Sequence, residues 1–137
     1  MSLYRDHLNT ANPDLPIDDH VLSHWRSILG DPRLNYFIAE VDGMFAATCN
    51  LTIIPNLTYN LRPYGLIENV VTHADYRRRG LGRLVMEAAL STAWEAGCYK
   101  VMLLSGVGRA EAHRFYESMG FHGDKKAGFI AYRPEGY

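Results

Sequence analysis

The segment DYRRRGLGRLV, residues 75–85, places four arginines and two glycines within eleven positions. Basic side chains attract phosphate, and glycines let an anion approach several backbone N–H groups closely because they carry no side chain. The segment follows an apolar run and precedes an amphipathic one, so a strand would end and a helix begin there. Since helix N-termini favour anions, the pattern predicts a pyrophosphate-binding loop. A solvated basic face and a nucleic-acid patch are the alternatives.

Two known phosphate motifs do not fit this segment. A P-loop requires Lys followed by Ser or Thr after its last glycine, whereas Gly82 is followed by Arg83 and Leu84. A dinucleotide-binding fingerprint requires Gly or Ala three residues after the second glycine, where this chain has Val85. The remaining pattern is Arg-x-x-Gly-x-Gly, formed by Arg77, Gly80 and Gly82.

Composition argues against a nucleic-acid partner. The 137 residues include 14 Lys and Arg against 15 Asp and Glu, a formal net charge of −1. Proteins that grip a nucleic-acid backbone usually carry a basic excess, because each neutralised phosphate adds affinity through counterion release. With 47% hydrophobic and 21% charged residues, the chain is typical of a single globular domain, here residues 1–137.

Metal and membrane chemistry are not indicated. The two cysteines, Cys49 and Cys98, lie in apolar runs without the spacing of a zinc site, which predicts buried reduced thiols. No leader-like segment opens the sequence, and no apolar stretch approaches the roughly 20 residues that cross a bilayer. We therefore expect a cytoplasmic protein with no metal and no membrane partner.

Two side chains have the chemistry of a general base and a general acid. Glu68 lies among Ile67, Val70 and Val71, and a carboxylate with apolar neighbours tends towards a raised pKa, which suits a base near neutral pH. Tyr116 carries a phenol whose ordinary pKa near 10 suits protonation of a departing thiolate. The alternatives are a solvated face or a structural ion pair with an arginine for the acid, and a core position for the tyrosine.

The elements that must position these residues follow from hydrophobic periodicity and turn signals. The pattern predicts the end of a helix at residues 2–9 and an amphipathic helix from Asp18 or Asp19 to about Leu29. Asp42-Gly43 predicts a hairpin turn between two strands within residues 35–54. Strands at 64–73 and 98–104, joined by a helix at 81–96 whose apolar positions are Leu84, Val85, Ala88 and Ala89, predict a parallel βαβ unit.

The C-terminal part predicts one more helix and a hairpin. The run RAEAHRFYESMG predicts a helix that stops at Gly120, and its expected inner side is formed by Ala112, Phe115, Tyr116 and Met119. The following residues 121–133 have a glycine-rich middle and an alternating apolar end, which predicts a final β-hairpin.

Two motifs together resemble one family. Arg77-x-x-Gly80-x-Gly82 closely resembles the acetyl-CoA pyrophosphate loop of the GCN5-related N-acetyltransferase (GNAT) superfamily, which lies between that family's fourth strand and third helix. The segment AHRFYESMGF, residues 112–121, resembles its second signature, Ala-x-x-Phe-Tyr-x-x-x-Gly-Phe. The resemblance runs from about Leu34 to the C-terminus. It implies an α/β fold with a central mixed, mostly antiparallel sheet flanked by helices.

The chain departs from the family pattern in two places. It opens with a helix-like segment, so the family's first strand is missing here. Arg109 stands where the family commonly has Asn. Because a missing strand leaves a sheet edge uncovered, and edges tend to be paired or capped, we expect a homodimer.

The resemblance also implies a reaction and a site. Acetyl-CoA would bind where the sheet splays between strands 66–72 and 99–104. Its acetyl group would pass directly to a primary amine of a small-molecule acceptor, with a protein amine as the alternative. Glu68 would be the base and Tyr116 the acid. A non-catalytic acyl-CoA sensor of the same fold is the alternative. The implied cofactor contacts are Val70, Val71, Thr72, Arg77, Arg78, Arg79, Gly80, Leu81, Gly82, Arg83, Arg109, Ala112 and Phe115.

Other polar residues near these positions are weaker candidates. His73 follows the third strand at the loop entrance, where we expect it to be solvated. The loop before that strand contains Asn56, Tyr59, Arg62 and Tyr64, which would shape an acceptor pocket, form turns or contact another subunit. Nothing in the sequence decides among sugar, amino acid, polyamine and antibiotic acceptors.

Overall fold

The computed structural model of the chain describes residues 2–8 and 15–136. It divides into two compact units, Met1–Leu103 and Leu104–Tyr137. The first unit contains the β-sheet and the helices that cover it, and the second contains one helix with the segments on either side. The assignment of residues 1–137 to a single domain stays a prediction.

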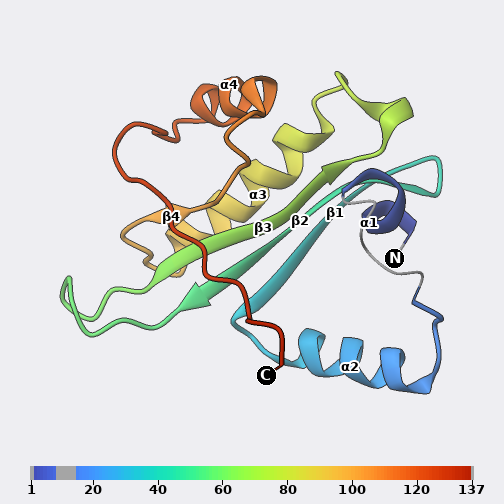
Figure 1. Cartoon of the computed structure of the whole chain (residues 1–137), viewed down its shortest axis with the longest axis horizontal. Coiled ribbons are helices and arrows are strands. Elements are labelled where there is room, and N and C mark those ends of the chain that lie inside the picture. Colours follow the sequence, from blue (N-terminus) through green and yellow to red (C-terminus); the bar gives the residue numbers. More distant parts are fainter. Residues whose placement is uncertain (1, 9–14, 137) are drawn as a thin grey trace. The chain divides into compact units, whose positions relative to one another are not determined.

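A four-stranded sheet forms the centre of the first unit (Figure 1). Its strands are β1 (Leu34–Val41), β2 (Met44–Ile54), β3 (Tyr64–Thr72) and β4 (Val101–Met102), in the order β1-β2-β3-β4. The first two pairings are antiparallel and the last is parallel, which confirms the predicted mixed, mostly antiparallel sheet. The predicted hairpin turn also forms, since Asp42 and Gly43 both have positive φ, as a tight two-residue turn requires.

Three α-helices belong to the first unit: α1 (Ser2–His7), α2 (Asp19–Gly30) and α3 (Leu81–Glu95). Asp18 caps α2, because its carboxylate accepts the backbone N–H of Val21 at 2.9 Å. The predicted end of the first helix at Asn9 lies outside the described residues. Within the described chain, the elements before β1 are helices only, which agrees with the predicted absence of an earlier strand.

Helix α3 packs against β1, β2 and β3 and completes the core. Its buried residues are Val85, Met86, Ala89 and Ala93. The expected inner positions Leu84 and Ala88 instead face outwards, so the apolar stripe is rotated relative to the prediction. Helical spacing fits two neighbouring stripes here, and contact with the sheet selects the one that contains Met86.

The two faces of the sheet are covered differently. The Cys49 thiol donates to the Val85 carbonyl oxygen at 3.4 Å, so Ala47, Cys49 and Leu51 of β2 face α3. Thr48 faces the other side, where it is buried and hydrogen-bonded to Tyr4 of α1. On that second face α1 packs on β2 and β3, and α2 contacts β1 at the edge of the sheet.

The second unit is built around α4 (Ala110–Ser118). Its C-terminus closes through two bonds, from the Gly120 N–H to the Glu117 carbonyl at 3.0 Å and from the Phe121 N–H to the Tyr116 carbonyl at 3.1 Å. This paired closure needs a left-handed residue after the helix, and Gly120 supplies it with φ +88°. The predicted helix stop at Gly120 is confirmed.

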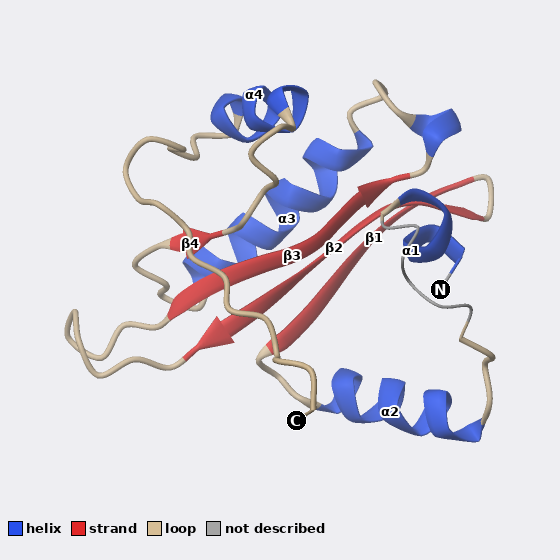
Figure 2. Cartoon of the chain, viewed as in Figure 1, coloured by secondary structure: helices blue, strands red, loops and turns tan. Residues whose placement is uncertain are grey.

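The predicted C-terminal hairpin is wrong. Residues 121–133 contain turns and extended coil but no strand (Figure 2). Phe129 and Tyr132 are 93% and 84% exposed, so the alternating apolar side chains have no sheet to pack on. An isolated two-stranded hairpin is marginal in water, and alternation alone does not form one without a partner surface.

Candidate functional site

Strands β3 and β4 pair only at their starts. The parallel ladder joins Gly65 to Val101 and Leu66 to Met102, so the predicted strand 98–104 is reduced to two residues. The approach there is close, because a Cβ on Gly65 would lie 2.9 Å from Leu51 Cδ1 and 3.1 Å from Val101 Cγ2. Beyond Leu66, the described strands leave the β4 side of β3 without a ladder partner. This opening matches the predicted splay of the sheet.

A β-bulge interrupts β3 beside this opening. Thr48 pairs with Val71 and Asn50 pairs with Glu68, so Cys49 of β2 lies opposite two residues of β3, Asn69 and Val70. Asn69 has φ +54°, a left-handed conformation that Asn tolerates better than most residues. The extra residue changes the side to which each following side chain points. The bulge is the main local feature of β3 that the sequence did not reveal.

Glu68 immediately precedes the bulge and is exposed, which differs from the apolar setting that its sequence neighbours suggest. The reason is the alternation of the strand. Ile67 pairs with Leu51 and is buried on the α3 side, so Glu68 points to the opposite side. The carboxylate is thus accessible to a solute on the face that also carries α1 and α2.

A polar row crosses this second face of the sheet. The register places Tyr36 of β1 opposite Asn50 of β2, and Asn50 opposite Glu68 of β3, so all three side chains point the same way. The Asn69 amide donates to Asn50 Oδ1 at 3.0 Å and ties the bulge to the row. Sequence reasoning missed Tyr36 and Asn50, because their relation to Glu68 arises only from strand pairing.

The predicted phosphate loop leads directly into α3. After β3 the chain forms a short 3₁₀ helix, η1 (Ala74–Tyr76), and then turns at Gly80. Gly80 is the N-cap of α3 with φ +78°, and neither a capping side chain nor a first-turn acid is found at this described helix start. The first-turn N–H groups of the helix therefore have no side-chain cap at Gly80, a local geometry that favours an anion.

The arginines of the loop have different local partners. Arg77 Nε donates to the Thr72 carbonyl oxygen at 3.4 Å and fastens the loop to the end of β3. The Arg79 guanidinium lies over the Tyr76 ring, 5.2 Å from its centroid. Arg83 pairs with Glu87 at 3.7 Å along α3. Exposed Arg78 has φ +60° and, with Gly80, reverses the chain before the helix.

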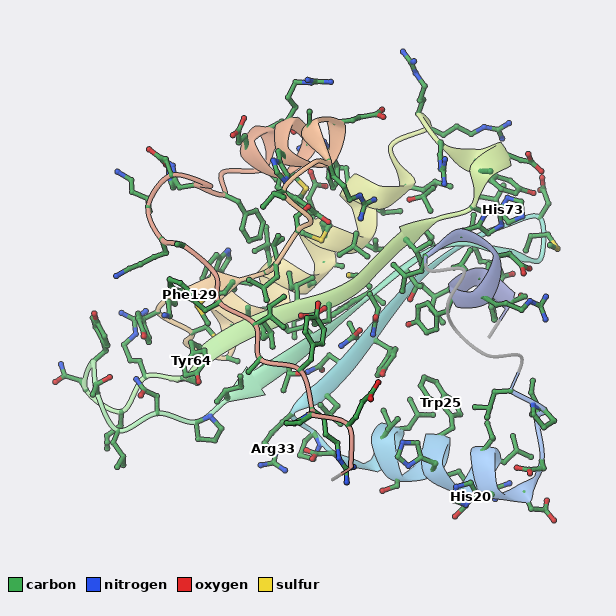
Figure 3. All side chains as sticks on the ribbon, viewed as in Figure 1. His20, Trp25, Arg33, Tyr64, His73 and Phe129 are labelled. Atoms are coloured by element: carbon green, nitrogen blue, oxygen red, sulfur yellow. The ribbon has the colours of Figure 1, made fainter. Side chains whose placement is uncertain are left out.

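His73 is a capping residue at the loop entrance. Its Nδ1 accepts the Asp75 backbone N–H at 3.2 Å, and its ring lies 4.1 Å from that of His7 in α1. Its side chain is 25% exposed, so the expectation of a solvated His73 is wrong. Figure 3 shows it at the α1 end of the sheet. The residue joins the N-terminal helix to the loop.

The remaining predicted site residues lie in the second unit. Tyr116 and Phe115 are half-buried on α4, with ring centroids 5.4 Å apart, and Tyr116 also meets the Phe121 ring edge-on at 6.1 Å. Ala112 is half-buried one turn earlier, and Arg109 is the N-cap of the helix without a side-chain capping bond. Their position relative to Glu68 stays a prediction.

The loop before β3 packs on the segment that follows α3. Asn56 Nδ2 donates to Thr58 Oγ1 at 2.8 Å, and Arg62 donates to the Gly97 and Cys98 carbonyls at the end of α3. Tyr59 and Tyr64 pack with Tyr99, at ring distances of 4.0 and 6.4 Å. These contacts are those of a packed turn, one of the alternatives for this segment, and its role in shaping an acceptor pocket stays a prediction.

The cysteines are free and buried, as predicted. Burial raises the pKa of the Cys49 thiol to about 12 and also raises the pKa of Cys98. Neither thiol is therefore available as a nucleophile near neutral pH. The described residues contain no cluster of three or more metal-ligating side chains and no helix long and apolar enough to cross a membrane.

Comparison with known proteins places this geometry in a family. The model of the acetyltransferase (GNAT) family matches residues 1–121. A candidate acetyltransferase from Agrobacterium tumefaciens strain C58 superposes with a TM-score of 0.87 at 43% identity, covering 96% of this chain and 90% of that one. The structure of glucosamine-6-phosphate N-acetyltransferase from Arabidopsis thaliana gives a TM-score of 0.78 at 27% identity, covering 90% and 83%.

Sequence relatives agree over a shorter stretch. Glucosamine 6-phosphate N-acetyltransferase of Trypanosoma brucei brucei is 32% identical over 90 residues, which cover 66% of this chain and 59% of that protein. The Arabidopsis thaliana enzyme of the same name is 36% identical over 81 residues, covering 59% and 52%. The matched part thus spans between half and three-fifths of these two curated relatives.

Proposed function

The chain belongs to the acetyltransferase (GNAT) family, and on that premise we propose that it transfers the acetyl group of acetyl-CoA directly to a primary amine of a small-molecule acceptor. The observation that carries the proposal is the N-terminus of α3. It follows β3 through Gly80, has no side-chain cap, and lies at the end of the strand whose β4 side is open.

These features fit acetyl-CoA. The N–H groups of residues 78–83 would hold its pyrophosphate, with Arg77, Arg78, Arg79 and Arg83 adding positive charge. The backbone of Val70, Val71 and Thr72, which lacks a β4 partner, would bind the pantetheine arm and the thioester carbonyl. When bound, acetyl-CoA supplies an acetyl group activated as a thioester. Leu81, Gly82, Arg109, Ala112 and Phe115 complete the proposed contacts.

The protein's own side chains would move the protons. Glu68 would take a proton from the acceptor ammonium, directly or through water, so that the nitrogen lone pair attacks the carbonyl carbon. A C–N bond forms and the C–S bond breaks. Tyr116 would give its phenolic proton to the departing sulfur. The exposed carboxylate of Glu68 suits the first role because an acceptor can reach it from solvent.

The first test combines binding and turnover. Acetyl-CoA should bind saturably in calorimetric titration, and an amine panel should release CoA thiol. Glu68→Gln should keep the affinity for acetyl-CoA and lower kcat by about 10²-fold, the usual size of a general-base effect. The control is Glu40→Gln, another exposed glutamate on a strand, which should change neither. An acyl-CoA sensor would bind equally well, release no thiol with any amine and be insensitive to both substitutions.

We also propose that two copies associate. Strand β1 is an edge of the sheet, and the described chain has no strand beyond it. Edges with free N–H and C=O groups tend to be paired or covered. Light scattering at high protein concentration should give twice the mass of the chain, and a monomer mass would contradict the dimer.

A further inference from the structure

A cluster of aromatic side chains lies beside the polar row of Tyr36, Asn50 and Glu68, on the face of the sheet that carries α1 and α2. Trp25 of α2 meets Tyr36 of β1 edge-on, with ring centroids 4.9 Å apart and planes at 83°. Tyr4 of α1 is half-buried, bonds to Thr48 and lies near Tyr36. Figure 3 shows Trp25 rising from α2 towards the strands. Trp25 of α2 and Tyr36 of β1 therefore form an aromatic wall, with Tyr4 of α1 nearby.

The wall and the carboxylate are a fixed distance apart. Tyr36 and Glu68 occupy positions in register on β1 and β3, with Asn50 of β2 between them. Two strand spacings separate them by about 10 Å. Because Trp25 is 37% exposed and Glu68 is exposed, both ends of this span are open to a solute.

The row carries a negative charge and no positive one. Glu68 is its single ionisable acid, Asn50 and Tyr36 are neutral, and the row contains no cationic residue. A protonated amine is complementary to the carboxylate, and an apolar or aromatic group is complementary to the rings of Trp25 and Tyr36. A phosphate ester would meet an acid and no cation within the row.

We propose that the acceptor is a small primary amine whose nitrogen lies at Glu68 and whose other end is an aromatic or apolar group packed against Trp25 and Tyr36. This inference rests on the proposed function for the reaction itself. It adds the substrate class and assigns Trp25 and Tyr36 as specificity-determining residues. It also separates this chain from the glucosamine 6-phosphate specificity that the names of its relatives state.

The test is a length series of phenylalkylamines assayed by CoA thiol release. Benzylamine, 2-phenylethylamine and 4-phenylbutylamine are compared with butylamine, glucosamine and glucosamine 6-phosphate. The proposal expects kcat/KM to be highest for 4-phenylbutylamine, whose extended length best matches the span. Highest kcat/KM with glucosamine 6-phosphate, or no difference between 4-phenylbutylamine and butylamine, would overturn it.

Substitution of Trp25 tests whether this residue binds the aromatic end of the acceptor. Trp25→Ala should raise KM for 4-phenylbutylamine by at least about tenfold, equivalent to the loss of one aromatic contact, with little change in kcat. KM for butylamine and the Kd for acetyl-CoA should not change. Trp94→Ala removes the other tryptophan, an exposed residue of α3, and serves as the matched control. An unchanged KM in Trp25→Ala would overturn the assignment.

Direct binding separates this inference from the proposed reaction. In a Trp94→Phe background Trp25 is the sole tryptophan. Its emission should change saturably with 4-phenylbutylamine and not with glucosamine 6-phosphate. Such binding without thiol release from any amine would support the aromatic site and contradict the proposed function. The absence of an emission change would contradict the site, even if acetyl transfer occurs.

Discussion

The Asn69 side-chain amide donates a hydrogen bond to Asn50 Oδ1 at 3.0 Å, at the bulge within the open part of β3. The bond joins the residue that turns the strand, at φ +54°, to the neighbour of Glu68 in the pairing register. It therefore links the backbone proposed to bind the thioester to the carboxylate proposed to act as the base. We infer that the pair positions both groups.

Replacing Asn69 should separate backbone strain from side-chain bonding. Asn69→Ala loses the hydrogen bond. It also places alanine at a positive φ, which alanine tolerates less well than asparagine does. We therefore expect a loss of about 2 kcal/mol in the free energy of unfolding. Asn69→Gly retains the conformation but not the bond, so it should lose less stability. If the pair positions the site, kcat falls about tenfold in both variants.

The control for Asn69 is another left-handed asparagine. Asn60 has φ +57° and is exposed in the loop before β3. Asn60→Ala should cost comparable backbone strain in denaturant unfolding and leave kcat unchanged. Full activity in Asn69→Gly would show that the side-chain bond has no positioning role.

Two glycines at the ends of α3 allow a matched test of the phosphate loop. Gly80 and Gly97 both have φ +78°, and a Cβ at either would meet no atom within 4 Å. Alanine at each position should therefore cost a similar strain, about 1 kcal/mol. Calorimetric titration should show weaker acetyl-CoA binding for Gly80→Ala alone, because only Gly80 precedes the helix N-terminus. Equal affinity in the two variants would place the pyrophosphate elsewhere.

Tyr116→Phe tests the proposed acid. Removing the hydroxyl should lower kcat by about 10²-fold and leave the Kd for acetyl-CoA unchanged, since the ring and its contact with Phe121 remain. Tyr132→Phe, an exposed tyrosine of the same unit, is the control. A pH–rate profile identical to that of the unmodified protein, with unreduced kcat, would leave Tyr116 with only a packing role.

The buried thiols of Cys49 and Cys98 should not react with a thiol reagent in the folded protein. Because burial raises the Cys49 pKa to about 12 and also raises that of Cys98, almost no thiolate exists at pH 8, and a thiol reagent should react with neither until the chain unfolds. The raised pKa of Cys49 favours folding below the thiol's unfolded pKa, and this contribution is lost as pH rises towards 12.

Unfolding measured against pH checks this linkage. Stability should fall from about pH 9 upwards, and Cys49→Ala should reduce the slope of that fall. Rapid labelling of one thiol at pH 8 in the folded protein would contradict the burial on which both expectations rest.

Local sequence signals were sufficient for many of the elements. Asp42-Gly43 fixed the hairpin because its two left-handed residues match the twist of the strands. Gly80 and Gly120 were recognisable as boundaries of α3 and α4 since each requires positive φ. The spacing of Arg77, Gly80 and Gly82 could also be recognised from sequence, because the proposed phosphate binding depends on consecutive backbone amides of one short segment.

The tertiary structure decided what depends on strand pairing and contact between distant segments. Alternation predicted a hairpin at 121–133 that does not form, and helical spacing alone did not choose between Leu84 and Met86 for the inner side of α3. The bulge at Asn69 and the row from Tyr36 to Glu68 exist only once β1, β2 and β3 are in register. The phosphate loop was predictable because its residues are adjacent in sequence, and its role stays a prediction. The proposed acceptor surface required the fold, because its side chains come from α2, β1, β2 and β3 and come together only through long-range packing.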